Sequence, residues 1–268
     1  MDYKRIRLVV ISTLLSLLLL GNSYAQSPRT QPPVYVLVHG AWHGGWCWQR
    51  VSSILRGNGA VVYTPTLSGL GEHRNTLSPA VNLETHITDI VNLIEMEDLH
   101  DVILVGHSYA GAVIAGVADR IPQRLRKLVF LDPVLVESGQ SVLTAINSTL
   151  VTTDVTKAAA KDSGLSIPAW PVSIFGIKDA ADARWVGQRL TAQPYRTFTQ
   201  KLTLSHPFGN HVPLIFIALT AEINPEFAHF ARSAKNDKKW KYFELATGHD
   251  AMMTAPKETA TLIESFAD

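Results

Sequence analysis

A serine set among small residues stands where an apolar run meets a helical stretch, and few folds accommodate such a junction. Residues 102–105 (VILV) lead directly into residues 106–111 (GHSYAG), and a helical pattern follows. A strand, a sharp turn centred on Ser108 and a helix would lift the serine hydroxyl to the carboxyl edge of a sheet. There it would lie beside a helix N-terminus, whose free N–H groups favour developing negative charge. The pattern predicts a nucleophilic Ser108, and the alternative is an ordinary strand-to-helix turn that contains a serine.

The turn departs from the usual G-x-S-x-G pattern at one place. Ala110 stands where the second glycine is expected, and Gly111 follows it immediately. Small residues are needed here because strand and helix approach each other closely. One added methyl group is a small disturbance, so we treat Ala110 as a tolerated variant.

The N-terminal 25 residues have the pattern of a secretory signal peptide. Basic residues within positions 4–7 precede the apolar run 8–20, and residues 23–25 (SYA) form a small-x-small cleavage site. The apolar run is too short for a comfortable membrane span. We expect cleavage after Ala25, which leaves residues 26–268 as a single exported domain, periplasmic or secreted, without a stable membrane anchor. The alternative is a retained N-terminal anchor.

Charge and cysteine content narrow the partners of the mature chain. Loss of residues 1–25 removes three basic side chains and one acidic one, so the formal charge changes from +1 to −1. A near-neutral chain without basic clusters gives no reason to expect a nucleic-acid partner. Export would permit a disulfide, but Cys47 is the only cysteine and has no intrachain partner. The oligomeric state stays open.

From Pro33 onward, short apolar runs alternate with segments of helical periodicity. The runs of strand length are residues 34–38, 60–63, 102–105, 127–131, 214–219 and 241–245. Helical spacing is found over residues 48–56, which a glycine-rich stop at 57–59 follows, and over residues 83–96. Strands that are apolar on both faces and alternate with helices predict an α/β domain with a buried, mostly parallel sheet.

The alternation stops between Pro133 and Pro213. A stretch as long as residues 134–212 is expected to carry short helices of its own. Its aromatic residues are Trp170, Phe175, Trp185, Tyr195, Phe198 and Phe208. Inserted above the carboxyl edge of the sheet, this stretch would form a lid over Ser108 and enclose an apolar pocket. We expect lid residues such as Trp170 and Trp185 to govern the choice of substrate.

Two further motifs follow expected strands. Residues 39–46 (HGAWHGGW) come after the first one, and a glycine-rich turn there leaves backbone N–H groups free to face a ligand. Residues 247–250 (TGHD) come after the last one. We expect His39 to hold its loop by hydrogen bonds. A metal role for His39 and His43 is not expected, because neither a carboxylate nor a third histidine accompanies them at ligand spacing.

Together these motifs resemble the α/β-hydrolase superfamily over nearly the whole mature chain. The resemblance rests on residues 36–46 (VLVHGAWHGGW), 65–71 (PTLSGLG), 105–108 (VGHS) and 248–249 (GH). More narrowly, the chain is similar to the group that contains plant methylesterases, hydroxynitrile lyases and related bacterial esterases. The resemblance implies the α/β-hydrolase fold, in which helices flank a mostly parallel central sheet and a helical lid is inserted after the sixth strand.

The resemblance also implies roles for individual residues. Ser108 is the implied nucleophile and His249 its general base, since serine, acid and histidine follow in this order along the chain in this superfamily. His107 cannot be the base, because the side chains of adjacent residues diverge. The backbone N–H groups of Ala41 and Tyr109 are the implied oxyanion hole.

Two carboxylates fit the chain order for the acid of the triad. Glu222 follows the expected strand 214–219, the commoner location in this fold, but residues 220–225 form a short stretch compared with lyase relatives. Asp132 ends the strand before the lid, a place that some dehalogenases and lactonases of the fold use. Pro133 favours an extended backbone at Asp132, which would project its side chain from the strand end. We favour Asp132 and keep Glu222 as the alternative.

The implied chemistry is two-step acyl transfer on a hydrophobic carboxylic ester, a small-molecule substrate, with no cofactor and no metal ion. Two other classes fit the resemblance: a hydroxynitrile lyase, which cleaves a C–C bond, and a ligand-binding protein with the hydrolase fold. Lyase relatives carry a threonine after the oxyanion-loop histidine and a lysine after the catalytic histidine, where this chain has Gly40 and Asp250. A carboxylate at position 250 would oppose departing cyanide, so hydrolysis is expected.

Overall fold

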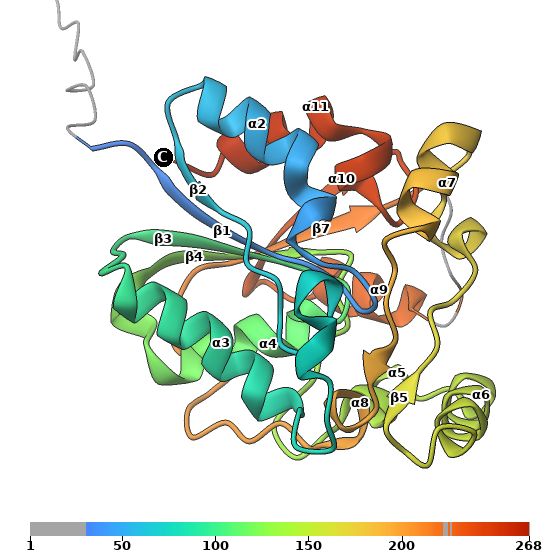
Figure 1. Ribbon diagram of the computed structural model, residues 1–268. Coiled ribbons are helices and arrows are strands. Elements are labelled where there is room, and N and C mark those ends of the chain that lie inside the picture. Colours follow the sequence, from blue (N-terminus) through green and yellow to red (C-terminus); the bar gives the residue numbers. More distant parts are fainter. Residues whose placement is uncertain (1–30, 222–224, 226, 268) are drawn as a thin grey trace, which may run out of the picture. The chain divides into compact units, whose positions relative to one another are not determined.

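The computed structural model describes residues 31–221, 225 and 227–267 (Figure 1). Its central sheet has six strands in the order β2-β1-β3-β4-β7-β8, and every neighbouring pair is parallel. The strands are β1 (Val34–Val38), β2 (Val61–Tyr63), β3 (Val102–His107), β4 (Leu125–Leu131), β7 (Leu214–Leu219) and β8 (Trp240–Leu245). The predicted α/β class is confirmed. The expected signal peptide, residues 1–25, lies outside the described residues.

Helices cover both faces of the sheet, which is why strands such as β3 and β7 are buried along their whole length. On one face α2 (Gln49–Gly57) packs against α11 (Pro256–Glu264), and on the other α3 (Leu83–Met96) packs against α4 (Ala110–Arg120) (Figure 1). The remaining helices outside the lid are α9 (Ala228–Asn236), α10 (Ala251–Thr254) and the 3-10 helices η1 (Gly45–Trp48), η2 (Gly71–Thr76) and η3 (Pro122–Arg124).

Local sequence explains where the helices begin and end. The side chain of Asn82 accepts from the backbone N–H of Thr85, and the Thr85 hydroxyl accepts from Asn82 in return, so α3 starts with a capping box. After α2 the chain turns at Gly59, whose φ of +88° favours glycine. The apolar stripe of α3 buries Leu83, Ile87, Ile90 and Ile94. Each such side chain contributes roughly 1.5–3 kcal/mol on burial.

The lid leaves the sheet after β4 and returns at β7. Its elements are α5 (Val142–Ile146), α6 (Thr149–Ala160), β5 (Ser166–Ile167), η4 (Val172–Phe175), α7 (Ala180–Gly187), β6 (Gln193–Pro194) and α8 (Arg196–Thr199). Strands β5 and β6 form a small antiparallel sheet. The expectation that the lid follows the sixth strand is wrong for this chain, because only β1, β2 and β3 precede β4 among the described residues.

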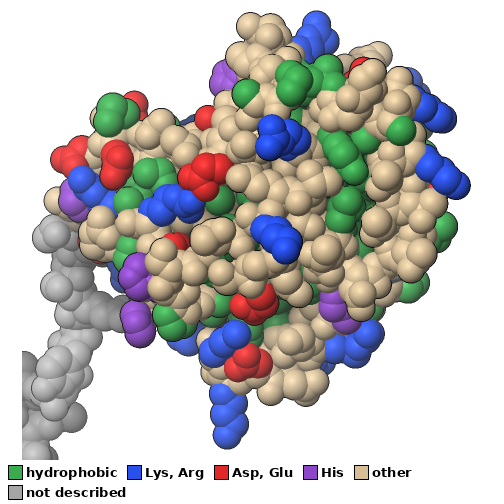
Figure 2. All heavy atoms as spheres, turned by 90° about the horizontal axis from the view of Figure 1, so that it is seen from below, with side chains coloured by type: hydrophobic (Ala, Val, Ile, Leu, Met, Phe, Trp, Pro, Cys, Tyr) green, Lys and Arg blue, Asp and Glu red, His purple; other side chains and the backbone are tan. Residues whose placement is uncertain are grey.

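Basic and acidic side chains are interspersed over the face drawn in Figure 2, without a continuous basic patch there. Nucleic-acid binders gather lysine and arginine on one face, and the absence of such a partner stays an expectation from the sequence. Among the described residues, no helix has both the length and the apolar character that crossing a bilayer requires.

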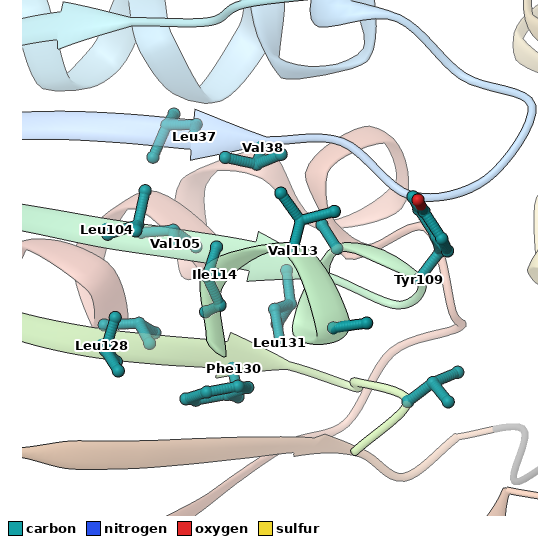
Figure 3. Packing of buried hydrophobic residues seen from close by; sticks show 14 of the residues in the cluster. Leu37, Val38, Leu104, Val105, Tyr109, Val113, Ile114, Leu128, Phe130 and Leu131 are labelled. Atoms are coloured by element: carbon teal, nitrogen blue, oxygen red, sulfur yellow. The ribbon is translucent and has the colours of Figure 1, made fainter. Parts of the chain in front are cut away.

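The core beneath the Ser108 turn joins α4 to the strands β3 and β4. Figure 3 shows Val113 and Ile114 of α4 lying among Leu104, Val105 and Leu131 of the sheet. All five side chains are buried and belong to one hydrophobic cluster. This packing fixes α4 against β3, the strand that precedes it in the chain, and so holds the turn between them.

Candidate active site

Ser108 stands at the sharp turn between β3 and α4. Its φ is +53°, a left-handed conformation that non-glycine residues rarely adopt and that costs roughly 1–3 kcal/mol. Backbone hydrogen bonds hold this conformation: the Ser108 N–H donates to Leu131, and its carbonyl accepts from Gly111 and Val134 at 3.0 and 2.9 Å. The turn predicted from the sequence is therefore present, and hydrogen bonds to neighbouring segments hold its strained residue in place.

Two glycines permit the close approaches that the turn requires. A Cβ atom at Gly106 would lie 2.8 Å from the carbonyl oxygen of Ala110, and one at Gly111 would lie 2.6 Å from the carbonyl oxygen of Val134. Backbone atoms cannot move aside cheaply, so both positions exclude a side chain. The tight contact falls on Gly111, which explains why an alanine is accommodated at position 110.

Asp132 and His249 form a short hydrogen bond beside Ser108. Nδ1 of His249, in the loop after β8, lies 2.6 Å from Oδ2 of Asp132, which follows β4. A carboxylate accepts, so Nδ1 carries the proton and Nε2 is left as the basic nitrogen. Ser108, Asp132 and His249 all line one pocket. The structure thus brings together the three side chains that the sequence analysis proposed as a triad.

The backbone of Asp132 differs from the expectation. Its φ is +43°, so the extended conformation inferred from Pro133 is wrong. The Asp132 N–H donates to the carbonyl of Ile217 at 2.8 Å, and this bond holds the left-handed turn in place. The alternative acid, Glu222, lies outside the described residues.

The environment of His249 suits a general base. Desolvation lowers the pKa of the imidazole, but the hydrogen bond that His249 donates to Asp132 and the charge of that carboxylate outweigh it, so the pKa is raised above its ordinary 6.5. His249 and Asp132 are 21% and 25% exposed, so both remain open to the pocket. An imidazole supported in this way accepts a proton more readily than a free one.

The loop after β1 brings Ala41 to the same pocket, and Tyr109 lies there at the start of α4. His39 holds this loop as expected, because its Nδ1 donates to the Gly40 carbonyl at 2.8 Å and its Nε2 accepts from the Leu67 N–H at 3.1 Å. Burial lowers the pKa of His39 to about 3, so the ring is neutral. Ala41 and Tyr109 thus flank Ser108, where an oxyanion hole requires its N–H donors.

The side chain of Tyr109 is held by His86 and Phe198. Its hydroxyl lies 2.9 Å from Nδ1 of the buried His86, and its ring stacks on Phe198 with centroids 5.7 Å apart. Burial lowers the pKa of His86 to about 4, so this histidine is also neutral. These contacts hold residue 109 rigidly next to the serine.

The pocket is lined mostly by apolar side chains, as small-molecule sites commonly are. Its aromatic lining is Trp42, Tyr109, Trp170, Phe175, Phe198 and Phe227. Trp170 packs on Trp42 with centroids 4.7 Å apart. The expected role of Trp185 is wrong, because Trp185 does not line this pocket. It packs instead on Trp46 and under Arg189, whose guanidinium lies 4.0 Å from the ring.

The sequence analysis missed a contact between His43 and Asp250. Nε2 of His43 lies 3.0 Å from Oδ2 of Asp250, and both side chains are buried away from the pocket. The carboxyl group at position 250 is therefore paired with His43, and its expected opposition to departing cyanide stays a prediction. No signal in the sequence joins two loops 207 residues apart. No cluster of three or more metal-ligating side chains occurs in the part of the chain that is described.

Comparisons with known proteins identify the same family as the sequence motifs do. A model of the alpha/beta hydrolase family matches residues 35–262. The carbendazim hydrolyzing esterase of Nocardioides sp. (strain SG-4G) is 38% identical over 235 residues, covering 84% of this chain and 96% of that protein. Putative methylesterase 14 of Arabidopsis thaliana, a chloroplastic protein, is 34% identical over 107 residues, which are 40% of this chain and 31% of the relative.

Among solved structures, an extracellular alpha/beta-hydrolase from a Paenibacillus species superposes with a TM-score of 0.76 at 26% identity. The match covers 87% of this chain and 98% of that one. That hydrolase shares structural and functional homology with tobacco Salicylic Acid Binding Protein 2. The similarity extends over the sheet and the lid alike.

Proposed function

This chain belongs to the alpha/beta hydrolase family and is a carboxylic ester hydrolase, and we propose that it cleaves hydrophobic esters through a Ser108–His249–Asp132 acyl-enzyme mechanism. The observation that carries the mechanism is the 2.6 Å contact between Asp132 and His249 in a pocket that Ser108 shares. An acid, a base and a hydroxyl on three separate strand ends have no structural need to converge on one cavity.

In the first step, Oγ of Ser108 attacks the ester carbonyl while Nε2 of His249 takes its proton. Asp132 keeps the other nitrogen protonated and supports the imidazolium that forms. The backbone N–H groups of Ala41 and Tyr109 donate to the oxyanion of the tetrahedral intermediate. His249 then gives the proton to the leaving alcohol, and the acyl group stays on Ser108.

In the second step, water replaces the alcohol. His249 takes a proton from the water, the hydroxide adds to the acyl carbonyl, and the same N–H groups bind the oxyanion. Collapse of this intermediate returns the proton to Oγ of Ser108 and releases the acid. Apart from the ester and the water, every group named in the cycle is a side chain or backbone group of this chain.

The substrate class follows from the lining of the pocket. Indole and phenyl rings from the lid and the oxyanion loop favour a planar, apolar acyl or alcohol group. The Nocardioides relative is named for hydrolysis of carbendazim. We therefore propose small esters of aromatic acids or alcohols as substrates, with carbendazim as a second compound to be tested.

The lack of space at Gly40 argues against hydroxynitrile lyase activity. A Cβ atom there would lie 2.8 Å from Nδ1 of His107 and 3.1 Å from Cβ of Ser108, so the threonine of the lyase relatives does not fit. The lysine of those relatives is also missing, because this chain has Asp250 at that position, and the Asp250 side chain contacts His43. Departing cyanide would find neither the hydroxyl nor the positive charge.

The test is a panel of p-nitrophenyl esters, aromatic methyl esters, carbendazim and mandelonitrile, measured with the wild type and Ser108→Ala. We expect ester hydrolysis that Ser108→Ala abolishes, and no matching cyanide release. Cyanide release rivalling ester hydrolysis would favour a lyase. Binding of the same aromatic esters without turnover by the wild type would favour a binding protein.

We further propose that the mature protein is exported as a single domain of residues 26–268 after cleavage behind Ala25. The support is the basic, apolar and small-residue pattern at the N-terminus. N-terminal sequencing of the protein from the periplasm and the medium of its host checks this. A chain that keeps residue 1 in the membrane fraction would contradict it.

A further inference from the structure

A second histidine–aspartate pair lies beside the first one. The side chains of His43 and Asp250 meet at 3.0 Å and are 1% and 0% exposed. His43 belongs to the loop that carries Ala41, and Asp250 directly follows His249. The pair therefore joins the proposed oxyanion loop to the segment that holds the proposed general base.

The contacts of His43 decide the charge of this pair. Nδ1 lies 2.7 Å from the carbonyl oxygen of Ala41, which only accepts, so Nδ1 carries a proton. A second proton lies between Nε2 and the carboxyl group of Asp250, because two lone pairs would repel each other at 3.0 Å. Whichever atom holds that proton, the pair has no net charge, which suits a buried site.

The peptide group between Ala41 and Trp42 is held at both ends. Its carbonyl accepts from Nδ1 of His43, and its N–H donates to Oε1 of the buried Gln193 at 2.9 Å. The next carbonyl, that of Trp42, accepts from the N–H of Thr191 at 2.9 Å. Trp42 has a φ of +64°, which a bulky residue keeps only where its surroundings leave it no alternative.

Hydrogen bonds hold the segment of His249 and Asp250 in a similar way. The carbonyl of His249 accepts from Nε2 of His107 at 2.9 Å, so it is tied to the residue before the nucleophile. The N–H of Asp250 donates to the carbonyl of Phe175 at 2.9 Å, which ties it to the lid. The bond to His43 adds the third tie, to the oxyanion loop.

We propose that His43 and Asp250 are positioning residues that set the Ala41 N–H in register with Ser108 and His249. The proposal rests on the serine hydrolase mechanism proposed above. Neither residue lines the pocket, so their effect passes through the backbone of Ala41. A displaced Ala41 N–H would weaken binding of the oxyanion in the transition state more than binding of the neutral ester.

Replacing the aspartate by asparagine is expected to affect the two histidine–aspartate pairs differently. In Asp250→Asn, the amide N–H can donate to Nε2 of His43 while Nδ1 still donates to Ala41, so the geometry is kept. In Asp132→Asn, an amide that donates to Nδ1 of His249 forces the proton onto Nε2, which is the wrong tautomer for a base. Asp250→Ala, by contrast, leaves His43 without its partner and frees the ring to turn.

The experiment measures kcat per active site, KM and inhibition by an arylboronic acid, which forms a tetrahedral adduct at Ser108. Active sites are counted by fluorophosphonate titration, and the melting temperature is recorded. We expect Asp250→Ala to lose about 10- to 100-fold in kcat and in boronate affinity with little change in KM. Asp250→Asn should recover most of that loss, whereas Asp132→Asn should not.

Three results would overturn the proposal. Asp250→Ala with unchanged kcat per titrated site and only a lower melting temperature would show a purely structural role. Asp250→Asn as damaging as Asp132→Asn would show that the charge, not the geometry, matters. Where Asp250→Ala does not fold, Gln193→Ala removes the other hold on the same peptide, and unchanged kcat in that variant would also refute the proposal. A wild type that fluorophosphonate does not label at Ser108 refutes the proposed function itself.

Discussion

Oδ2 of Asp132 lies 2.6 Å from Nδ1 of His249, and this contact joins the ends of two strands that are not neighbours in the sheet. Strand β7 lies between β4 and β8. Its following loop is the commoner place for the acid in this fold, and there the chain offers Glu222. The proposed acid, Asp132, thus follows the strand next to that of the proposed nucleophile.

This contact predicts unequal effects for two carboxylate substitutions. Asp132→Asn should lower kcat on a p-nitrophenyl ester by up to about 10⁴-fold, because His249 would adopt the wrong tautomer. Glu222→Gln, the matched control, should stay close to the wild type. Steady-state kinetics with both variants checks this, and the reverse ranking would assign the acid to Glu222.

Ser108→Ala should abolish covalent labelling and hydrolysis together. The hydroxyl oxygen is the proposed attacking atom, so kcat should fall by a factor on the order of 10⁶. Intact-mass analysis after fluorophosphonate treatment should show one adduct on the wild type and none on the variant. Labelling that persists in Ser108→Ala would place the nucleophile elsewhere.

The raised pKa of His249 predicts the acid limb of the pH profile. The base works only when unprotonated, so kcat/KM should rise with pH through the pKa of the free enzyme, with a midpoint above 6.5. Asp132→Asn removes the partner that raises this pKa, so the residual activity should show its midpoint at lower pH. A wild-type midpoint below 6.5 would contradict the assignment of the base.

The pocket lining predicts that Trp170 and Trp185 have different effects. Trp170→Ala removes a wall that packs on Trp42, so kcat/KM for aryl esters should fall about tenfold relative to short alkyl esters. Trp185→Ala, also in the lid but outside the pocket, should leave that ratio unchanged. Equal losses on every substrate would indicate general destabilisation instead.

Neutral buried histidines predict a loss of stability in acid. The pKa of His39 falls to about 3 in the folded protein, so the unfolded chain binds more protons between that value and 6.5. Stability should therefore decrease as the pH falls through this window, by roughly 2 kcal/mol from His39 alone at pH 5. Urea unfolding at pH 7 and pH 5 measures it. His39→Gln should show a shallower dependence, and equal slopes for both proteins would exclude His39 as a cause.

Regular elements could be predicted closely because their causes are local. The helix over 83–96 occurs with its expected bounds, since its apolar stripe and its Asn82 cap lie within a few residues of each other. The strands differ from expectation by two residues at most, because apolar runs of strand length leave little choice in a covered sheet. The Ser108 turn could be predicted equally well, because small residues flank the serine.

Contacts between distant loops could not be predicted in the same way. The His43–Asp250 pair depends on two strand ends that meet in space. Neither of the two sequence motifs, residues 39–46 and 247–250, indicates that the other lies beside it. The left-handed backbone of Asp132 comes from a hydrogen bond to Ile217, which overrides the preference that Pro133 imposes. Trp185 was misplaced because composition shows that a lid is aromatic and not which rings face inward. The catalytic roles of Ser108 and His249 stay predictions until they are measured.

The place of Asp132 ahead of the lid separates the inheritance of chemistry from that of selectivity. The proposed nucleophile and acid lie on one continuous stretch that ends at Pro133, and the lid contacts that stretch through the backbone N–H of Val134, which donates to Ser108, and through Phe198, which stacks on Tyr109. Recombination with breakpoints at Pro133 and Pro213 would therefore exchange a relative's whole lid while Ser108, Asp132 and His249 pass on unchanged. The incoming lid would have to supply again the contacts that Gln193, Thr191 and Phe175 make to Trp42 and Asp250.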